Sequence, residues 1–274
     1  MNKLLVSMIG SGLLAATAAA TPITVSDDYV GGTGGWGDNN NHSSPSSSLL
    51  KGDVIGDANI FGVDSMTITQ NESYFNFDIK TNFAGKQGTY YGDYIGYGDL
   101  FLGNSWTPNG SSSDGFASDE AFSSVWTYAL VLDNKAGGSG DLLLYKMYEN
   151  STSTVLLSND FMEPTANGYR KNQEVALNLG AEDSGLIYNT QTVGSWTEDL
   201  ANNLLKMEID LTGTGLLDSN TLAFHWTMYC ANDVIQGQAD ITPVSVPEPG
   251  LLSLLGVGIA GLWFARRRQQ KKVA

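Results

Sequence analysis

Short runs of alternating apolar and polar residues fill most of the chain between residues 49 and 243, and clusters of Gly, Asn, Asp and Ser separate them. Alternation puts apolar side chains on one face of a strand and polar side chains on the other, and the separating residue types form tight turns. The clearest strands are predicted at residues 74–79, with Phe75, Phe77 and Ile79 on one face, and at residues 222–230, with Leu222, Phe224, Trp226, Met228 and Cys230 on one face.

The other predicted strands cover residues 54–61, 66–69, 100–102, 125–132, 142–148, 154–157, 174–177, 205–211 and 234–240, with one more early in the chain at residues 23–30. Apolar spacing of three and four residues, the mark of a helix, is confined to a short stretch at residues 197–205. Many short strands without alternating helices predict an all-β fold, an antiparallel β-sandwich or jelly-roll in a single domain over residues 49–243. Residues 21–48, rich in Gly, Ser and Asn, form a lead-in with little apolar surface to bury.

The N-terminus has the pattern of a secretory signal peptide. Lys3 precedes an apolar run at residues 4–16, and small residues follow up to Ala20. Signal peptidase substrates share this order of a positive residue, an apolar stretch and small residues. We therefore expect a signal helix over residues 1–20 that is removed after Ala20. The alternative, a buried N-terminal helix, is disfavoured because Thr21, Pro22 and two aspartates follow closely.

A second signal occupies the C-terminus, residues 246–274. In chain order it consists of Pro247, Glu248 and Pro249, a glycine-bearing apolar stretch at residues 251–265, and Arg266, Arg267 and Arg268. The stretch is shorter than the roughly 20 residues that cross a bilayer comfortably, but a short transmembrane helix over residues 250–265 suits a thin membrane. Basic residues stay on the cytoplasmic side of a span, so the body of the protein is expected outside the inner membrane.

In these features and in their order the tail resembles the PEP-CTERM sorting signal of exported bacterial proteins. The resemblance implies recognition by an exosortase, an integral-membrane cysteine transpeptidase of Gram-negative species that make an extracellular polysaccharide matrix. It further implies that the tail is removed or exchanged near Pro247, Glu248 and Pro249. It covers about a tenth of the chain and implies nothing about the chemistry of the body. A plain single-span anchor behind a proline-marked linker is the alternative.

The charge balance excludes some partners. The 274 residues hold 14 Lys and Arg against 29 Asp and Glu, a net charge of -15. Six of these bases and one of the acids lie in residues 1–20 and 247–274, so the remaining body holds 8 bases and 28 acids, a charge of -20. Nucleic acid binds through a basic surface that releases counterions, so we expect no nucleic-acid partner.

The sequence offers little catalytic chemistry. It holds no phosphate-binding loop and no G-x-S-x-G elbow, and its two histidines, His42 and His225, exclude an H-E-x-x-H zinc motif. His42 lies in the lead-in, and His225 is expected on the polar face of a strand as a surface or half-buried hydrogen-bonding residue. Pairs of acidic residues suitable for a glycosidase exist in any chain this acidic, so their presence does not indicate a glycosidase active site. Cys230, the single cysteine, shares a face with Trp226 and Met228 and is expected in the core.

Structural calcium is a possible cofactor in three loops that combine Asp, Asn or Glu with Gly. These loops are residues 93–99, 115–120 and 133–141. Hard oxygen ligands on tight loops suit this ion. Their spacing does not match a helix-loop-helix calcium site, and Asp-Gly turns occur in any β-protein, so the prediction remains no cofactor and no metal ligands.

Residues 88–106 interleave aromatic residues with glycines. Flat aromatic rings with polar tips suit stacking on sugar rings, which makes Tyr94, Tyr97 and Trp106 the candidate sugar-binding residues. The alternative is a hairpin whose tyrosines cover the edge of the sheet.

Taken together, the sequence predicts an exported protein of the cell surface or the biofilm matrix, processed at both ends, whose body is a non-enzymatic structural or adhesive β-domain. A carbohydrate-binding module that associates with exopolysaccharide is the second hypothesis, and a secreted hydrolase with a carboxylate pair is the third.

Overall fold

The computed structural model describes residues 21–31, 54–90, 92–163 and 169–243. Ten strands form one antiparallel sheet in the order β1-β2-β3-β12-β11-β8-β7-β6-β13-β14. In that order the strands are β1 (Ile23–Ser26), β2 (Val63–Asn71), β3 (Tyr74–Thr81), β12 (Leu204–Asp210), β11 (Ile187–Asp199), β8 (Ser139–Met147), β7 (Tyr128–Leu132), β6 (Leu100–Gly103), β13 (Thr221–Thr227) and β14 (Val234–Asp240).

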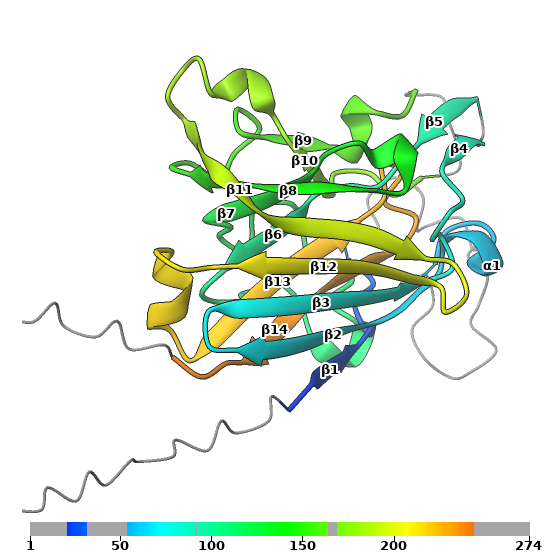
Figure 1. Ribbon diagram of the computed structural model, residues 1–274. Helices are drawn as coiled ribbons and strands as arrows, with labels where there is room; N and C mark the ends of the chain where they lie inside the picture. The colour runs from blue at the N-terminus through cyan, green and yellow to red at the C-terminus, as the bar shows by residue number, and fades with distance from the viewer. Residues whose placement is uncertain (1–20, 32–53, 91, 164–168, 244–274) are drawn as a thin grey trace, which may run out of the picture.

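The two edges of this sheet approach each other. Strand β14 lies against both β1 and β2, and a Cβ atom on Gly237 would lie 3.4 Å from the Val25 side chain. Figure 1 shows β13 and β14 crossing behind β12, β3 and β2. The prediction of an all-β antiparallel fold is confirmed, whereas the sandwich or jelly-roll is not, because one nearly closed sheet replaces two separate sheets.

Two hairpins and a few short helices complete the described part of the chain. Strand β9 (Val155–Leu157) pairs with β10 (Glu174–Leu177), and β4 (Gly88–Tyr90) pairs with β5 (Asp93–Ile95). Within that part, α1 (Ala58–Phe61) is the one α-helix, and the 3-10 helices are η2 (Ser112–Asp114), η3 (Lys135–Gly137), η4 (Ser158–Asp160), η5 (Leu179–Ala181) and η6 (Gly215–Asp218).

Apolar side chains are buried on both faces of part of the sheet. The larger cluster fills the inside of the curled sheet and includes Phe77, Leu144, Trp196, Met207 and Phe224. A second cluster lies on the outer face of β6, β7, β8 and β13, where the β9–β10 hairpin contributes Val155 and Leu177. Complete burial of one such side chain contributes about 1.5–3 kcal/mol.

Three sequence-based predictions of local structure are wrong. Residues 58–61 form α1 rather than a strand, because Asp57 caps the turn by accepting a hydrogen bond from the Asn59 backbone. Residues 197–205 form no helix, since they contain the turn between β11 and β12. Strand β13 was expected to be half-buried, but its second face is covered as well, with Ala223, His225 and Thr227 all buried.

Among the described residues, no helix has the length and apolar character needed to cross a membrane. The predicted signal helix, residues 1–20, and the predicted transmembrane helix, residues 250–265, lie outside those residues.

Candidate functional site

The β4–β5 hairpin presents the tyrosine-rich segment that the sequence singled out. Gly88 pairs with Ile95, Thr89 with Tyr94 and Tyr90 with Asp93. The turn includes Gly92, whose φ of +100° strains any other residue. The hairpin lies beside the main sheet, near α1 in Figure 1.

Tyr97 belongs to the core and has no ring face to offer a sugar. Its side chain is 0% exposed, and its ring packs edge-on against Phe83 and Trp196 with centroid distances of 5.6 and 5.9 Å. Its hydroxyl donates to Glu198 Oε1 at 2.5 Å and accepts from the Gly85 backbone at 2.8 Å. Burial, and then the hydrogen bond to Glu198, raise the pKa of Tyr97 well above its usual value. Tyr97 therefore anchors the inside of the sheet.

The three predicted sugar-binding residues do not form one surface. Trp106 is partly buried against the second cluster, on the outer face of the sheet, and meets Phe116 edge-on at a centroid distance of 4.8 Å. Tyr94 on β5 is 51% exposed. Of the three residues, Tyr94 alone keeps a largely exposed ring.

Tyr94 instead lies beside aromatic residues from distant parts of the chain. A Cβ atom on Gly96 would lie 3.2 Å from the Tyr94 ring and 3.1 Å from the Tyr229 ring. The Tyr229 ring stacks on Phe161 with a centroid distance of 4.2 Å and an interplanar angle of 20°, and both rings are half-buried. We call Tyr94, Tyr229 and Phe161 the Gly96 aromatic cluster.

No sequence pattern links Tyr229 and Phe161 to Tyr94, because they are more than 60 residues from it. Tyr229 joins the segment through its backbone, which donates to Gly96 O at 3.0 Å. The one usable signal is the run of glycines around Tyr94 and Tyr97, since a glycine in a strand often marks the close approach of another group.

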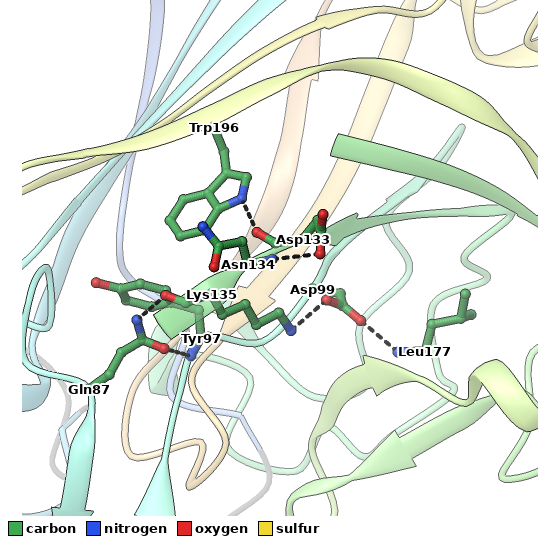
Figure 2. A network of polar contacts seen from close by, with 8 residues as sticks. All are labelled: Gln87, Tyr97, Asp99, Asp133, Asn134, Lys135, Leu177 and Trp196. Carbon is green, nitrogen blue, oxygen red and sulfur yellow. Dashed lines mark hydrogen bonds and ion pairs between the residues drawn. The ribbon is translucent and has the colours of Figure 1, made fainter. Parts of the chain in front are cut away.

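A network of polar contacts links the segments before and after the β4–β5 hairpin to η3 and β10. Lys135 of η3 forms an ion pair with Asp99 at 2.8 Å, and the second oxygen of Asp99 accepts from the Leu177 backbone at 2.9 Å. Gln87 donates to Lys135 O at 2.6 Å and accepts from the Tyr97 backbone at 3.4 Å. Figure 2 shows these contacts joining β10, η3 and the segments on either side of the β4–β5 hairpin.

The pKa of Lys135 is set by opposing effects. Burial lowers this pKa. Asp99 and the Tyr229 hydroxyl, whose ring lies 5.4 Å from the ammonium, together raise it by more than burial lowers it, so the pKa of Lys135 exceeds its usual value. Lys135 is therefore a charged structural residue in contact with one member of the Gly96 aromatic cluster.

The loop at residues 133–141, one of the possible calcium loops, is held by hydrogen bonds within the loop and from β11. Trp196 donates to Asp133 O at 2.7 Å, and the Asp133 carboxylate accepts from the Asn134 backbone at 2.7 Å (Figure 2). In the loop at residues 93–99, Asp99 is occupied by Lys135 and Leu177. The described residues contain no group of three or more His, Cys, Asp or Glu placed to hold a metal.

His225 is fully buried, contrary to the prediction of a surface or half-buried position. Both ring nitrogens are engaged: Nε2 lies 2.6 Å from Glu174 O, and Nδ1 lies 2.6 Å from Gln236 Oε1. Gln236 in turn contacts Asp119, which accepts a hydrogen bond from Tyr29 at 2.8 Å. Because β10 covers this face from a distant part of the chain, the sequence pattern of β13 gave no sign of it.

Cys230 is buried among apolar side chains of the inner cluster, as predicted. Burial raises the pKa of its thiol well above the usual range, so the thiolate needed for nucleophilic chemistry is disfavoured.

The comparisons with known proteins concern the tail. Residues 245–269 match the family model of the PEP-CTERM protein-sorting motif, which confirms the resemblance noted in the sequence. No curated protein and no solved structure matches the chain significantly. The residues of this motif, like Ala20 and His42, lie outside the described part of the chain. The motif implies an exported protein that is processed by an exosortase, a membrane enzyme.

Proposed function

We propose that this PEP-CTERM protein is delivered to the cell surface or the extracellular matrix of a Gram-negative bacterium, where its body serves as a non-enzymatic structural or adhesive β-domain. Signal peptidase removes residues 1–20, and the exosortase processes the tail near Pro247, Glu248 and Pro249. The observation that carries the proposal is the sorting motif at residues 245–269.

The folded body ends close to this motif. Beyond β14, Gln70 of β2 holds the chain by donating to Thr242 O at 2.7 Å and accepting from Thr242 N at 2.8 Å. Five peptide units separate Thr242 from Pro247, and they span at most about 17 Å when fully extended. The tail is therefore processed with the β2 and β14 end of the sheet near the membrane enzyme.

His225 and Cys230, two side chains of types that serve in hydrolytic enzymes, are both enclosed in the fold, which supports a role without catalysis. Both nitrogens of His225 are occupied inside the protein, so it is not placed to act as a general base. Cys230 is buried, and its raised pKa disfavours the thiolate.

Carbohydrate binding is the second candidate function for the body. It is favoured by one specific observation, the exposed ring of Tyr94 beside Tyr229 and Phe161.

Cell fractionation tests the delivery of the protein. An epitope inserted in the lead-in at residues 39–48 is expected in the surface or matrix fraction, on a product shorter than the full chain. A full-length product in the cytoplasm would contradict the proposal. As a control, replacing Arg266, Arg267 and Arg268 by Gln should reduce correct delivery, because the basic end retains the tail on the cytoplasmic side.

A further inference from the structure

We propose that the Gly96 aromatic cluster is a glycan-binding site that takes the flat face of a neutral pyranose ring on Tyr94. The proposal rests on the second candidate function and assigns it a site and a ligand class. A pyranose with equatorial substituents exposes axial C–H groups, and these pack on the face of an aromatic ring while the hydroxyls reach polar groups at its edge.

The cluster holds its rings in place before any ligand arrives. The Tyr94 and Tyr229 rings both lie within 3.2 Å of the position a Gly96 Cβ would take, so the absence of a side chain there lets them approach. Tyr229 is further fixed by the stacked Phe161 at 4.2 Å and by Lys135 over its ring. A rigid platform loses little conformational entropy on binding.

Polar groups border the platform. Thr89 is the direct cross-strand partner of Tyr94 and is exposed, so its side chain lies on the same face, with Cβ atoms about 5 Å apart. Its hydroxyl both donates and accepts hydrogen bonds, as sugar hydroxyls do. The Tyr94 hydroxyl provides a second such group at the tip of the ring.

The charges nearby favour a neutral sugar over an acidic one. Asp93 precedes Tyr94 in β5, with its side chain on the other face of the hairpin. It accepts a hydrogen bond from the Glu163 backbone at 3.1 Å, so two acidic residues lie close to the platform. Lys135, which lies over the Tyr229 ring, is already paired with Asp99. A uronic-acid carboxylate at this site would be repelled by these two acidic residues.

Affinity electrophoresis of the full chain tests the proposal, in a sugar-free non-ionic detergent, with hydroxyethyl cellulose as the neutral probe and polygalacturonate as the acidic one. We expect hydroxyethyl cellulose to retard the parent protein and polygalacturonate not to. Tyr94→Ala should weaken the binding about tenfold, because it removes the exposed ring, while Tyr94→Phe should keep most of it.

Tyr74→Ala is the matched control, since Tyr74 is 60% exposed on β3. It should leave the retardation unchanged, and each variant should melt within about 2 °C of the parent because both tyrosines are largely exposed. The proposal is overturned if hydroxyethyl cellulose does not retard the parent, if polygalacturonate retards it equally, or if Tyr74→Ala weakens binding as much as Tyr94→Ala. Fractionation of the same strains reports separately on the proposed delivery, so a failed glycan site with normal delivery is distinguished from a failed function.

Discussion

Cys230 and Tyr97 are acidic groups that the fold keeps neutral in its interior. Burial raises the pKa of both above their usual values. In the unfolded chain a cysteine has a pKa of about 8.5 and a tyrosine a pKa of about 10. Above those values the unfolded state loses protons that the native state retains, so the stability of the fold decreases as pH rises.

We predict that the free energy of unfolding falls between pH 8.5 and 10, by up to about 1.4 kcal/mol per pH unit from Cys230 alone. Urea unfolding at several pH values measures the slope. Cys230→Ala should be less stable at neutral pH, because it leaves a small cavity, yet it should show a flatter decline in this window. The same slope in Cys230→Ala and in the parent would mean that the thiol also titrates in the folded protein, which would contradict the raised pKa.

The Lys135 and Asp99 pair joins η3 to the β9–β10 hairpin through Leu177. Replacing Lys135 by Met leaves the Asp99 carboxylate buried without its cation, and we predict a loss of about 3 kcal/mol of stability. Chemical denaturation measures it. Lys146→Met is the control, since Lys146 is exposed on β8, and it should change stability by less than about 0.5 kcal/mol. An equal loss of stability in the two variants would show that the buried ion pair contributes no more to stability than an exposed lysine does.

At the scale of the elements, strands with clean alternation could be predicted from the sequence. Strands β10 and β14 lie where the pattern placed them, and β3 extends its predicted range by two residues. The long strand β11 was missed. Two register shifts against β8, between Asn189 and Gln191 and between Thr192 and Gly194, interrupt the period of two that reveals a strand.

On its other side, β11 approaches β12 closely at a glycine. A Cβ atom on Gly194 would lie 1.8 Å from Glu208 O of the neighbouring strand β12, so β11 and β12 approach closely because this side chain is absent. We predict that Gly194→Ala destabilises the protein by more than about 2 kcal/mol. Thermal and urea denaturation measure the effect. Gly88→Ala, whose Cβ would meet its nearest neighbour at 3.9 Å, should be nearly neutral, and a similar loss in both variants would contradict the close approach.

For the whole molecule, local patterns indicate strands but not how a sheet closes. Apolar and polar residues alternate along the strands of a sandwich and of a curled sheet alike. The two folds differ here because β14, from the far end of the chain, contacts β1 and β2. The same limit applies to the candidate site. Tyr94 was identified in the sequence, but Tyr229 and Phe161 join it only through the fold, and Tyr97 points into the core.

The C-terminal end of the chain differs in this respect, because a sorting motif is recognised through its own short sequence. The sorting motif was recognisable without any structure, and the family model confirms it. The structure adds that Gln70 fixes the chain through Thr242, shortly before that motif.

The intact mass of the protein recovered from the cell surface or matrix tests this account most directly. We predict a mass that corresponds to a chain beginning at Thr21 and ending near Pro247, with or without a group attached by the exosortase. Replacing Pro247, Glu248 and Pro249 by Ala should shift the mass to a chain that retains its C-terminal residues. A native protein recovered with the mass of all 274 residues would contradict processing at both ends.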